Sequence, residues 1–178
     1  LVVEDEKKHP FSLVTIKADG SVSSNALSPG LFQADDDFWK LDDLEALALD
    51  KAGNIYALTS HSRDADGDDK KSRAKLVRFR LEGERVVAPV VVKGLKHALA
   101  AVHPLLAHAA GIRDVKNDGG LNIEAMEISP DNSSGQQRLL IGFRSPLLDN
   151  RAIIASVENP AAIFEAGEAP RIAAKLET

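Results

Sequence analysis

The chain contains no cysteine among its 178 residues. This absence excludes a disulfide framework, a thiolate metal site and a cysteine nucleophile. Phe, Trp and Tyr together make up only 4% of the residues, and the formal net charge is −5. Surfaces that bind nucleic acids are normally basic and carry stacking aromatic rings, so this composition argues against a nucleic-acid partner.

The sequence also lacks a long apolar run. No stretch is apolar for the roughly 20 residues that a membrane-spanning helix needs, so we expect no membrane span. A hydrophobic content of 44% is ordinary for a soluble globular protein, and 178 residues suffice for one domain with a buried core. The compartment stays open between cytoplasm and periplasm, because a chain that starts at Leu1 does not show whether a signal peptide was removed.

Two segments of the chain repeat one pattern. LDDLEALALDKAGNIYALTSHSRD occupies residues 41–64, and GLNIEAMEISPDNSSGQQRLLIGFRSPLLD occupies residues 120–149. Each has a Glu that leads a short apolar strand, then a turn at an Asp, a second apolar strand and an exit rich in Ser and Arg. Repeated strand–turn–strand units are typical of blade architectures, so we expect an all-β fold with β-propeller-like blades of four antiparallel strands.

The remaining segments are assigned from their periodicity. Apolar residues recur at helical spacing from residue 94 to 111 and are interrupted by Pro104, which predicts two short helices. Pro89 cannot donate to a strand ladder, so its strand is expected at a sheet edge. We expect a partial blade and connection (1–40), a blade (41–92), a helical insertion (93–119), a blade whose last strand lies near 161–165 (120–165), and the start of a further strand (166–178).

The number of blades bears on assembly. A closed propeller needs about four or more blades, whereas this chain holds two and a part of another. We therefore expect an incomplete propeller, whose exposed strand edges favour self-association or pairing with further chain.

The repeated glutamates are the main candidate site. Glu45 and Glu124 each share a strand face with the apolar residues two and four positions on, so both carboxylates are expected on the buried side of a strand. Such burial costs several kcal/mol unless the carboxylate is paired or bound to a cation. Two interpretations stay open: the glutamates are structural and accept hydrogen bonds from a neighbouring blade, or they converge on a central funnel and bind a ligand or a metal ion, Ca²⁺ or Mg²⁺.

Basic and polar residues at the strand exits would complete this funnel. Arg63 and Arg144 can form salt bridges with the glutamates across blades, or they can present their forked donors to an anionic ligand such as phosphate or carboxylate. His61 can act as an acid or a base because its unperturbed pKa is about 6.5, and with Arg144 it is a candidate for a catalytic role. The predicted ligand-binding residues are Glu45, His61, Arg63, Asn122, Glu124, Arg144 and Ser145.

Other motifs carry less information. Residues 64–69 begin like a calcium loop, but Asp69 stands where glycine is required and Lys75 where glutamate is required, which favours a solvated acidic loop. The histidines of the helical insertion do not share a face at metal-ligand spacing. No Gly-x-Ser-x-Gly elbow, Walker loop or Rossmann glycine motif is present.

Three stretches carry a resemblance to a known family. DLEALALDKAGNIYALTSHSR, GLNIEAMEISPD and LLIGFRSPLLDNRAII resemble a bacterial family of propeller-like proteins, domain of unknown function 3616. Residues 122–124 and 142–146 are the most specific elements of the likeness, which covers most of residues 41–160. That family implies a longer propeller and carries no established activity. More distantly, the paired units resemble esterase-like and phytase-like propellers, which implies metal-assisted phosphoester chemistry, although the dense acidic clusters of those proteins are not reproduced here.

The sequence therefore predicts a propeller-like binding scaffold with a polar funnel for a small polar or anionic ligand. One alternative is a metal-dependent phosphoester hydrolase, in which Glu45 and Glu124 ligate Ca²⁺ or Mg²⁺ and Arg144 holds the phosphate. The other is an assembly module that pairs through its exposed blade edges. The residue pattern does not decide among the three.

Overall fold

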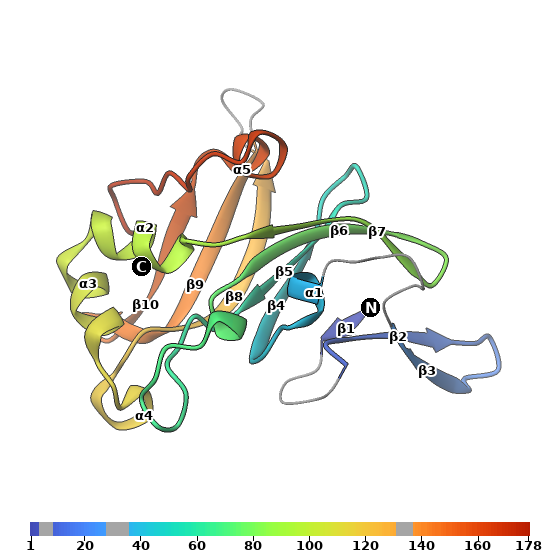
Figure 1. Ribbon diagram of the computed structural model, residues 1–178, viewed down its shortest axis with the longest axis horizontal. Coiled ribbons are helices and arrows are strands. Elements are labelled where there is room, and N and C mark those ends of the chain that lie inside the picture. The colour runs from blue at the N-terminus through green and yellow to red at the C-terminus, as the bar shows by residue number, and fades with distance from the viewer. Residues whose placement is uncertain (4–8, 28–35, 131–136) are drawn as a thin grey trace.

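A computed structural model of the chain describes residues 1–3, 9–27, 36–130 and 137–178. Antiparallel strands dominate it and form three sheets, with a few short helices beside them (Figure 1). This confirms the predicted all-β class with a short helical insertion. None of the three sheets closes on itself within the described residues.

The N-terminal sheet is a three-stranded meander in the order β1-β2-β3. Its strands β2 and β3 form a hairpin, which turns at Gly20 with a φ of 80°. The predicted connection that follows lies outside the described residues from 28 to 35, and its end forms the short helix α1 (Asp36–Trp39). The strands are β1 (Val2–Val3), β2 (Phe11–Ile16) and β3 (Val22–Ala26).

The second sheet is a four-stranded meander in the order β4-β5-β6-β7. Its first turn forms because the Asp50 carboxylate accepts hydrogen bonds from the backbone N–H groups of Ala52 and Asn54, at 2.9 and 2.8 Å. Strand β7 contains Pro89 and lies at the sheet edge, as predicted. The strands are β4 (Leu44–Leu49), β5 (Ile55–Thr59), β6 (Leu76–Glu82) and β7 (Arg85–Val92).

The helical insertion follows β7 and contains the two predicted helices, α2 (Leu95–Val102) and α3 (Pro104–Gly111). Pro104 starts the second helix, since the first helical position needs no N–H donor. A third short helix, α4 (Val115–Asp118), follows them within the predicted insertion. Asp114 caps it by accepting from the Asn117 N–H at 3.0 Å.

The third sheet has the order β10-β9-β8. Its strands are β8 (Asn122–Pro130), β9 (Gln137–Leu148) and β10 (Arg151–Val157). The strand predicted near 161–165 is wrong, because Pro160–Ala166 forms the helix α5. Pro160 stands in its first turn and Gly167 ends it in the left-handed conformation, which are the usual signals of a helix start and stop.

The C-terminal residues lie beside this third sheet. Isolated antiparallel bridges join Ile154 to Glu177 and Val157 to Ile172. Ile154 and Glu177 exchange two backbone hydrogen bonds, both of 2.9 Å. Residues 171–177 therefore run along β10 as a fourth, irregular strand.

Both faces of the central sheet are buried. On one face, Tyr56, Leu58 and Leu76 join a cluster formed with β8–β10 and the helices. On the other face, Ala57 and Phe79 join a cluster formed with the N-terminal sheet and α1. Burial on both faces explains why β5 reads as a nearly continuous apolar run.

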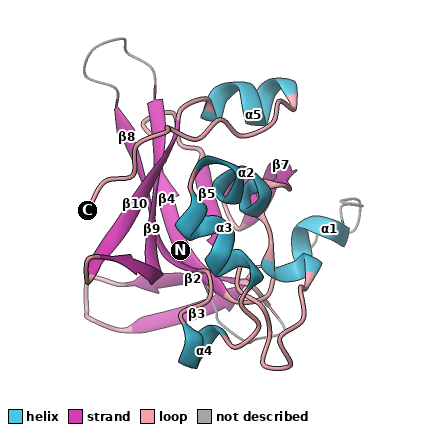
Figure 2. Ribbon diagram, turned by 90° about the vertical axis from the view of Figure 1, so that its left-hand side faces the viewer, coloured by secondary structure: helices cyan, strands magenta, loops and turns pink. Residues whose placement is uncertain are grey.

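The first strands of the sheets meet at the middle of the molecule. Strand β4 contacts both β1 and β8, and the Ile123 N–H donates to the Ser60 carbonyl at 2.9 Å. Helices α2, α3 and α5 lie along one side of the strands (Figure 2). None of the described helices is long and apolar enough to cross a membrane. This arrangement places the beginnings of β4 and β8 beside the helical insertion, where the candidate site lies.

Candidate functional site

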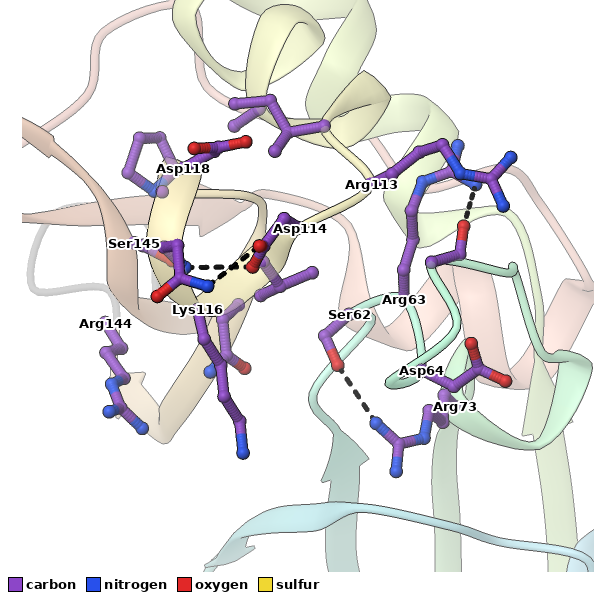
Figure 3. A pocket seen from close by; sticks show the side chains of 18 of the residues that line it. Ser62, Arg63, Asp64, Arg73, Arg113, Asp114, Lys116, Asp118, Arg144 and Ser145 are labelled. Carbon is purple, nitrogen blue, oxygen red and sulfur yellow. Dashed lines mark hydrogen bonds between the residues drawn. The ribbon is translucent and has the colours of Figure 1, made fainter.

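A cavity of about 990 Å³ opens where β4 and β8 begin (Figure 3). One wall comes from the start of β4 and the exit of β5, a second from the ends of β8 and β9 that face it, and a third from α3 and α4. Six of the seven predicted ligand-binding residues lie in these walls; that they bind a ligand stays a prediction. They are Glu45, Arg63, Asn122, Glu124, Arg144 and Ser145.

The two glutamates lie at matching irregularities of the backbone. The strand register shifts between Leu44 and Ala46 in one sheet and around Ile123 and Ala125 in the other, so Glu45 and Glu124 are the residues at the two β-bulges. A bulge re-aims the side chain of the extra residue. The expectation that both carboxylates face the core is therefore wrong: the Glu124 side chain is 39% exposed and Glu45 is half-buried.

Arg144 and Glu124 form an ion pair across the strands β8 and β9. Arg144 Nη1 donates to Glu124 Oε1 at 2.9 Å, and the arginine side chain is 67% exposed. A salt bridge with a glutamate was one of the two predicted alternatives for Arg144, but it was expected across two blades, and this pair lies within one sheet. An exposed single contact of this kind contributes little to stability, so the pair orients the arginine more than it holds the fold.

Arg63 has different partners from those expected. Its Nη1 donates to the Gly67 carbonyl at 3.1 Å, and its Nη2 pairs with Asp69 Oδ2 at 3.0 Å. Asp64 accepts from two backbone N–H groups of the same loop and pairs with Lys70 Nζ at 3.0 Å, and the bond from the Asp68 N–H lowers the pKa of Asp64 most. Residues 64–69 thus form the predicted solvated acidic loop. Arg63 holds this loop in the cavity wall through its contacts with Gly67 and Asp69.

Asp43 is the centre of a polar network that the sequence interpretation missed. It has a φ of 61°, and its Oδ2 accepts from Ser60 Oγ, from Ser62 Oγ at 3.0 Å and from Arg73 Nη1 at 3.1 Å. Arg73 also binds Asp42 through Nε at 2.8 Å. The Asp-Asp pair directly before β4 and the Ser-x-Ser exit of β5 were the available signals in the sequence.

His61 does not line the cavity. It is 1% exposed, has a φ of 56°, and its Nδ1 lies 2.8 Å from the Thr59 carbonyl, which fixes Nδ1 as the protonated nitrogen. Its Nε2 is buried and has no hydrogen-bond partner. Burial lowers the pKa of His61 to about 4, so the ring is neutral at neutral pH.

The helical insertion contributes residues to which the sequence interpretation gave no role. Lys116 and Arg113 line the cavity together with Asp114 and Asp118. Figure 3 shows Lys116 on α4 extending into the same space as Arg144. Their sequence context is an ordinary polar helix without a motif, so only the folded arrangement identifies them.

The donor set for a metal ion is incomplete. Across residues 1–3, 9–27, 36–130 and 137–178, no three His, Asp or Glu side chains are grouped so that they could hold a metal ion. Glu45 and Glu124 lie in one cavity, but Ca²⁺ normally takes six to eight oxygen ligands and Mg²⁺ about six. The two glutamates alone do not make such a site.

Comparisons with known proteins add no relative from which a role could be transferred. No family model, no curated protein and no solved structure gives a significant match to this chain.

Proposed function

We propose that this chain is a propeller-like binding scaffold that holds a small polar ligand in the cavity between the first strands of two blades. One observation carries the proposal: six residues that were selected from two distant, repeated segments line a single cavity. If these residues had only structural roles in separate blades, we would not expect them to line the same cavity.

The arrangement of the sheets supports the blade interpretation. Each sheet is a meander, the first strands of neighbouring sheets contact each other, and the sheets pack face to face through apolar clusters. Blades of a propeller pack in this way around their innermost strands.

The size and chemistry of the cavity favour a small molecule. Its volume lies at the upper end of the roughly 300–1,000 Å³ that is common for small-molecule sites. Charged side chains of both signs line it, together with hydroxyl and amide groups such as those of Ser62 and Asn122. Such walls suit a ligand that is recognised by hydrogen bonds and charge.

The proposal is tested by ligand-detected NMR with a library of small polar metabolites. Glu124→Gln is compared with Glu127→Gln, which changes an exposed glutamate on the same strand outside the cavity. We expect at least one compound to bind the wild type and the Glu127 variant, and to bind the Glu124 variant about tenfold more weakly. The proposal would be overturned if no compound bound, or if the compounds that bind had the same affinity for the Glu124 variant.

If the melting temperature instead rises with Ca²⁺ or Mg²⁺ and this rise needs both glutamates, the metal-dependent hydrolase becomes the better account.

One observation favours assembly as a second function. All five residues of the edge strand β3 are exposed, and the strand has no charged residue or proline. The edge strand β7, by contrast, contains Pro89, and residues 171–177 cover β10. Unprotected edges of this kind pair with other strands. Analytical ultracentrifugation should then show self-association that Ser24→Lys abolishes and Ser21→Lys, in the preceding turn, does not. A wild-type monomer at every concentration would contradict this.

A further inference from the structure

The basic side chains in the cavity walls differ in how far their donors are already used. Three of them are tied to acidic residues, whereas the ammonium group of Lys116 has no ion-pair partner in the part of the chain that the structure describes. The three tied residues are Arg73, paired with Asp42 and Asp43, Arg63, paired with Asp69, and Arg113, paired with Asp68.

Arg144 is also largely available. Its one side-chain contact is the bond from Nη1 to Glu124 Oε1, and the side chain is 67% exposed. A guanidinium group has five N–H donors in a planar fork. Most of the Arg144 fork therefore faces the cavity without a partner among the described residues, while Glu124 holds the group in position.

The acidic residues of the walls are mostly occupied. Asp43 accepts from two serines and Arg73, Asp64 pairs with Lys70, Asp114 caps α4, and Glu124 holds Arg144. Beside the carboxylates of Asp66 and Asp118, which also line the cavity, these walls still offer a ligand the hydrogen-bond donors and positive charge of Lys116 and Arg144. These donor groups lie on two separate elements, the helix α4 and the end of β9.

We infer that the ligand of this cavity carries an anionic group, a carboxylate or a phosphate, which Lys116 and Arg144 bind together. The inference rests on the proposed function and specifies its ligand class. Arg144 supplies two parallel N–H donors to one edge of the group, and Lys116 supplies a compact charge to another oxygen. Figure 3 shows both side chains extending in the same direction from the cavity wall.

The test is isothermal titration calorimetry with two probes of different geometry, inorganic phosphate and succinate, at low ionic strength. We expect the wild type to bind at least one probe, with the tighter probe showing whether the site suits a tetrahedral or a planar group. Lys116→Met and Arg144→Gln should each weaken binding about tenfold or more, because each removes charge-assisted hydrogen bonds. Added salt should weaken wild-type binding as well.

The matched controls are Lys51→Met and Arg80→Gln, which remove the same two kinds of charge from exposed positions outside the cavity. Both should bind the probes like the wild type. All four side chains are exposed, so circular dichroism melts should show that every variant folds. Lys116→Glu replaces the positive charge with a negative one and should abolish binding.

Three results would overturn the inference. If neither anion binds, while a neutral polyol or an amine binds and Glu124→Gln weakens it, the cavity is a ligand site of another class and the proposed function stands. If the anions bind equally well to the Lys116 and Arg144 variants, they bind elsewhere. If no compound of any class binds in the cavity, the proposed function fails together with the inference.

Discussion

Glu45 and Glu124 occupy the same place in two β-bulges, one at the start of β4 and one at the start of β8, and both line one cavity. The repeat in the sequence thus encodes a repeated irregularity of the backbone, and not a repeated buried charge. Bulges are frequent next to functional sites because they turn a side chain out of the ladder. The glutamate in each unit therefore faces the cavity.

The exposed ion pair of Glu124 leads to a first prediction. Glu124→Gln should change the free energy of unfolding by less than about 1 kcal/mol, because an exposed pair gains little over solvated charges. Urea denaturation measures this, with Glu127→Gln as the control. A loss of about 2 kcal/mol or more would favour the alternative that Glu124 is structural.

The buried His61 predicts a pH dependence of stability. Its pKa is about 4 in the folded protein and about 6.5 when unfolded, so the unfolded state binds the proton more readily. The stability contribution of the neutral ring is complete above about pH 6.5 and is lost as the pH falls towards about 4, by about 3 kcal/mol in total.

A variant isolates this contribution. His61→Asn keeps a residue that tolerates the left-handed backbone and cannot titrate. Urea denaturation at a series of pH values should show a shallower loss of stability for His61→Asn between about pH 6.5 and 4 than for the wild type. His97→Gln, at an exposed position, should follow the wild type. Parallel curves for all three proteins would show that His61 titrates normally.

Lys75 gives a third prediction. It is 1% exposed, and its Nζ donates to the carbonyls of Asp37 and Lys40 at 2.5 and 2.8 Å and pairs with Asp37 Oδ1 at 2.9 Å. Lys75→Met keeps most of the volume but leaves both carbonyls without this donor. We expect a loss of about 2–3 kcal/mol, measured by urea denaturation. The same change at the exposed Lys51 should cost less than about 0.5 kcal/mol, and equal effects at the two sites would contradict the role of Lys75.

Gly67 gives the fourth prediction, because a Cβ atom there would lie 2.9 Å from Arg113 Cβ. Gly53 has a similar positive φ, 83° against 77°, but its Cβ would meet no atom within 4 Å. Ala at either position should cost about 1–2 kcal/mol for the left-handed backbone, and Gly67→Ala should cost at least about 1 kcal/mol more. The difference in unfolding free energy between the two variants measures the contact. A difference near zero would mean that Arg113 moves aside freely.

Local patterns predicted much of the fold. The Asp50 turn and the break between α2 and α3 at Pro104 both depend on residues a few positions apart, which the sequence shows directly. The strand predicted near 161–165 was wrong because Ile163 and Phe164 resemble a short strand, while Pro160 and Gly167 mark the ends of a short helix. Seven residues are too few for periodicity to separate the two.

Non-local contacts account for the remaining errors. Lys75 directly precedes β6 and nothing in its local sequence indicates burial, but the carbonyl groups of Asp37 in α1 and of Lys40 after it, far away in the sequence, accept hydrogen bonds from its ammonium group. The position of each β-bulge depends on how β4 pairs with β5 and how β8 pairs with β9. The residues next to Glu45 and Glu124 in the sequence therefore do not show which way these side chains point. The repeated segments predicted the residues that line the cavity from the strands. Lys116 could not be predicted in the same way, because its place in the cavity depends on how α4 packs against the strands.

The hydrogen bond from the Ile123 N–H to the Ser60 carbonyl joins two sheets that otherwise meet through apolar side chains near the cavity. Apolar packing has no preferred direction, whereas a hydrogen bond fixes a point and an orientation. This bond therefore fixes one point at which the wall that carries Ser62 meets the wall that carries Arg144. The width of the cavity is thus set in part by a backbone contact between residues that do not themselves line it.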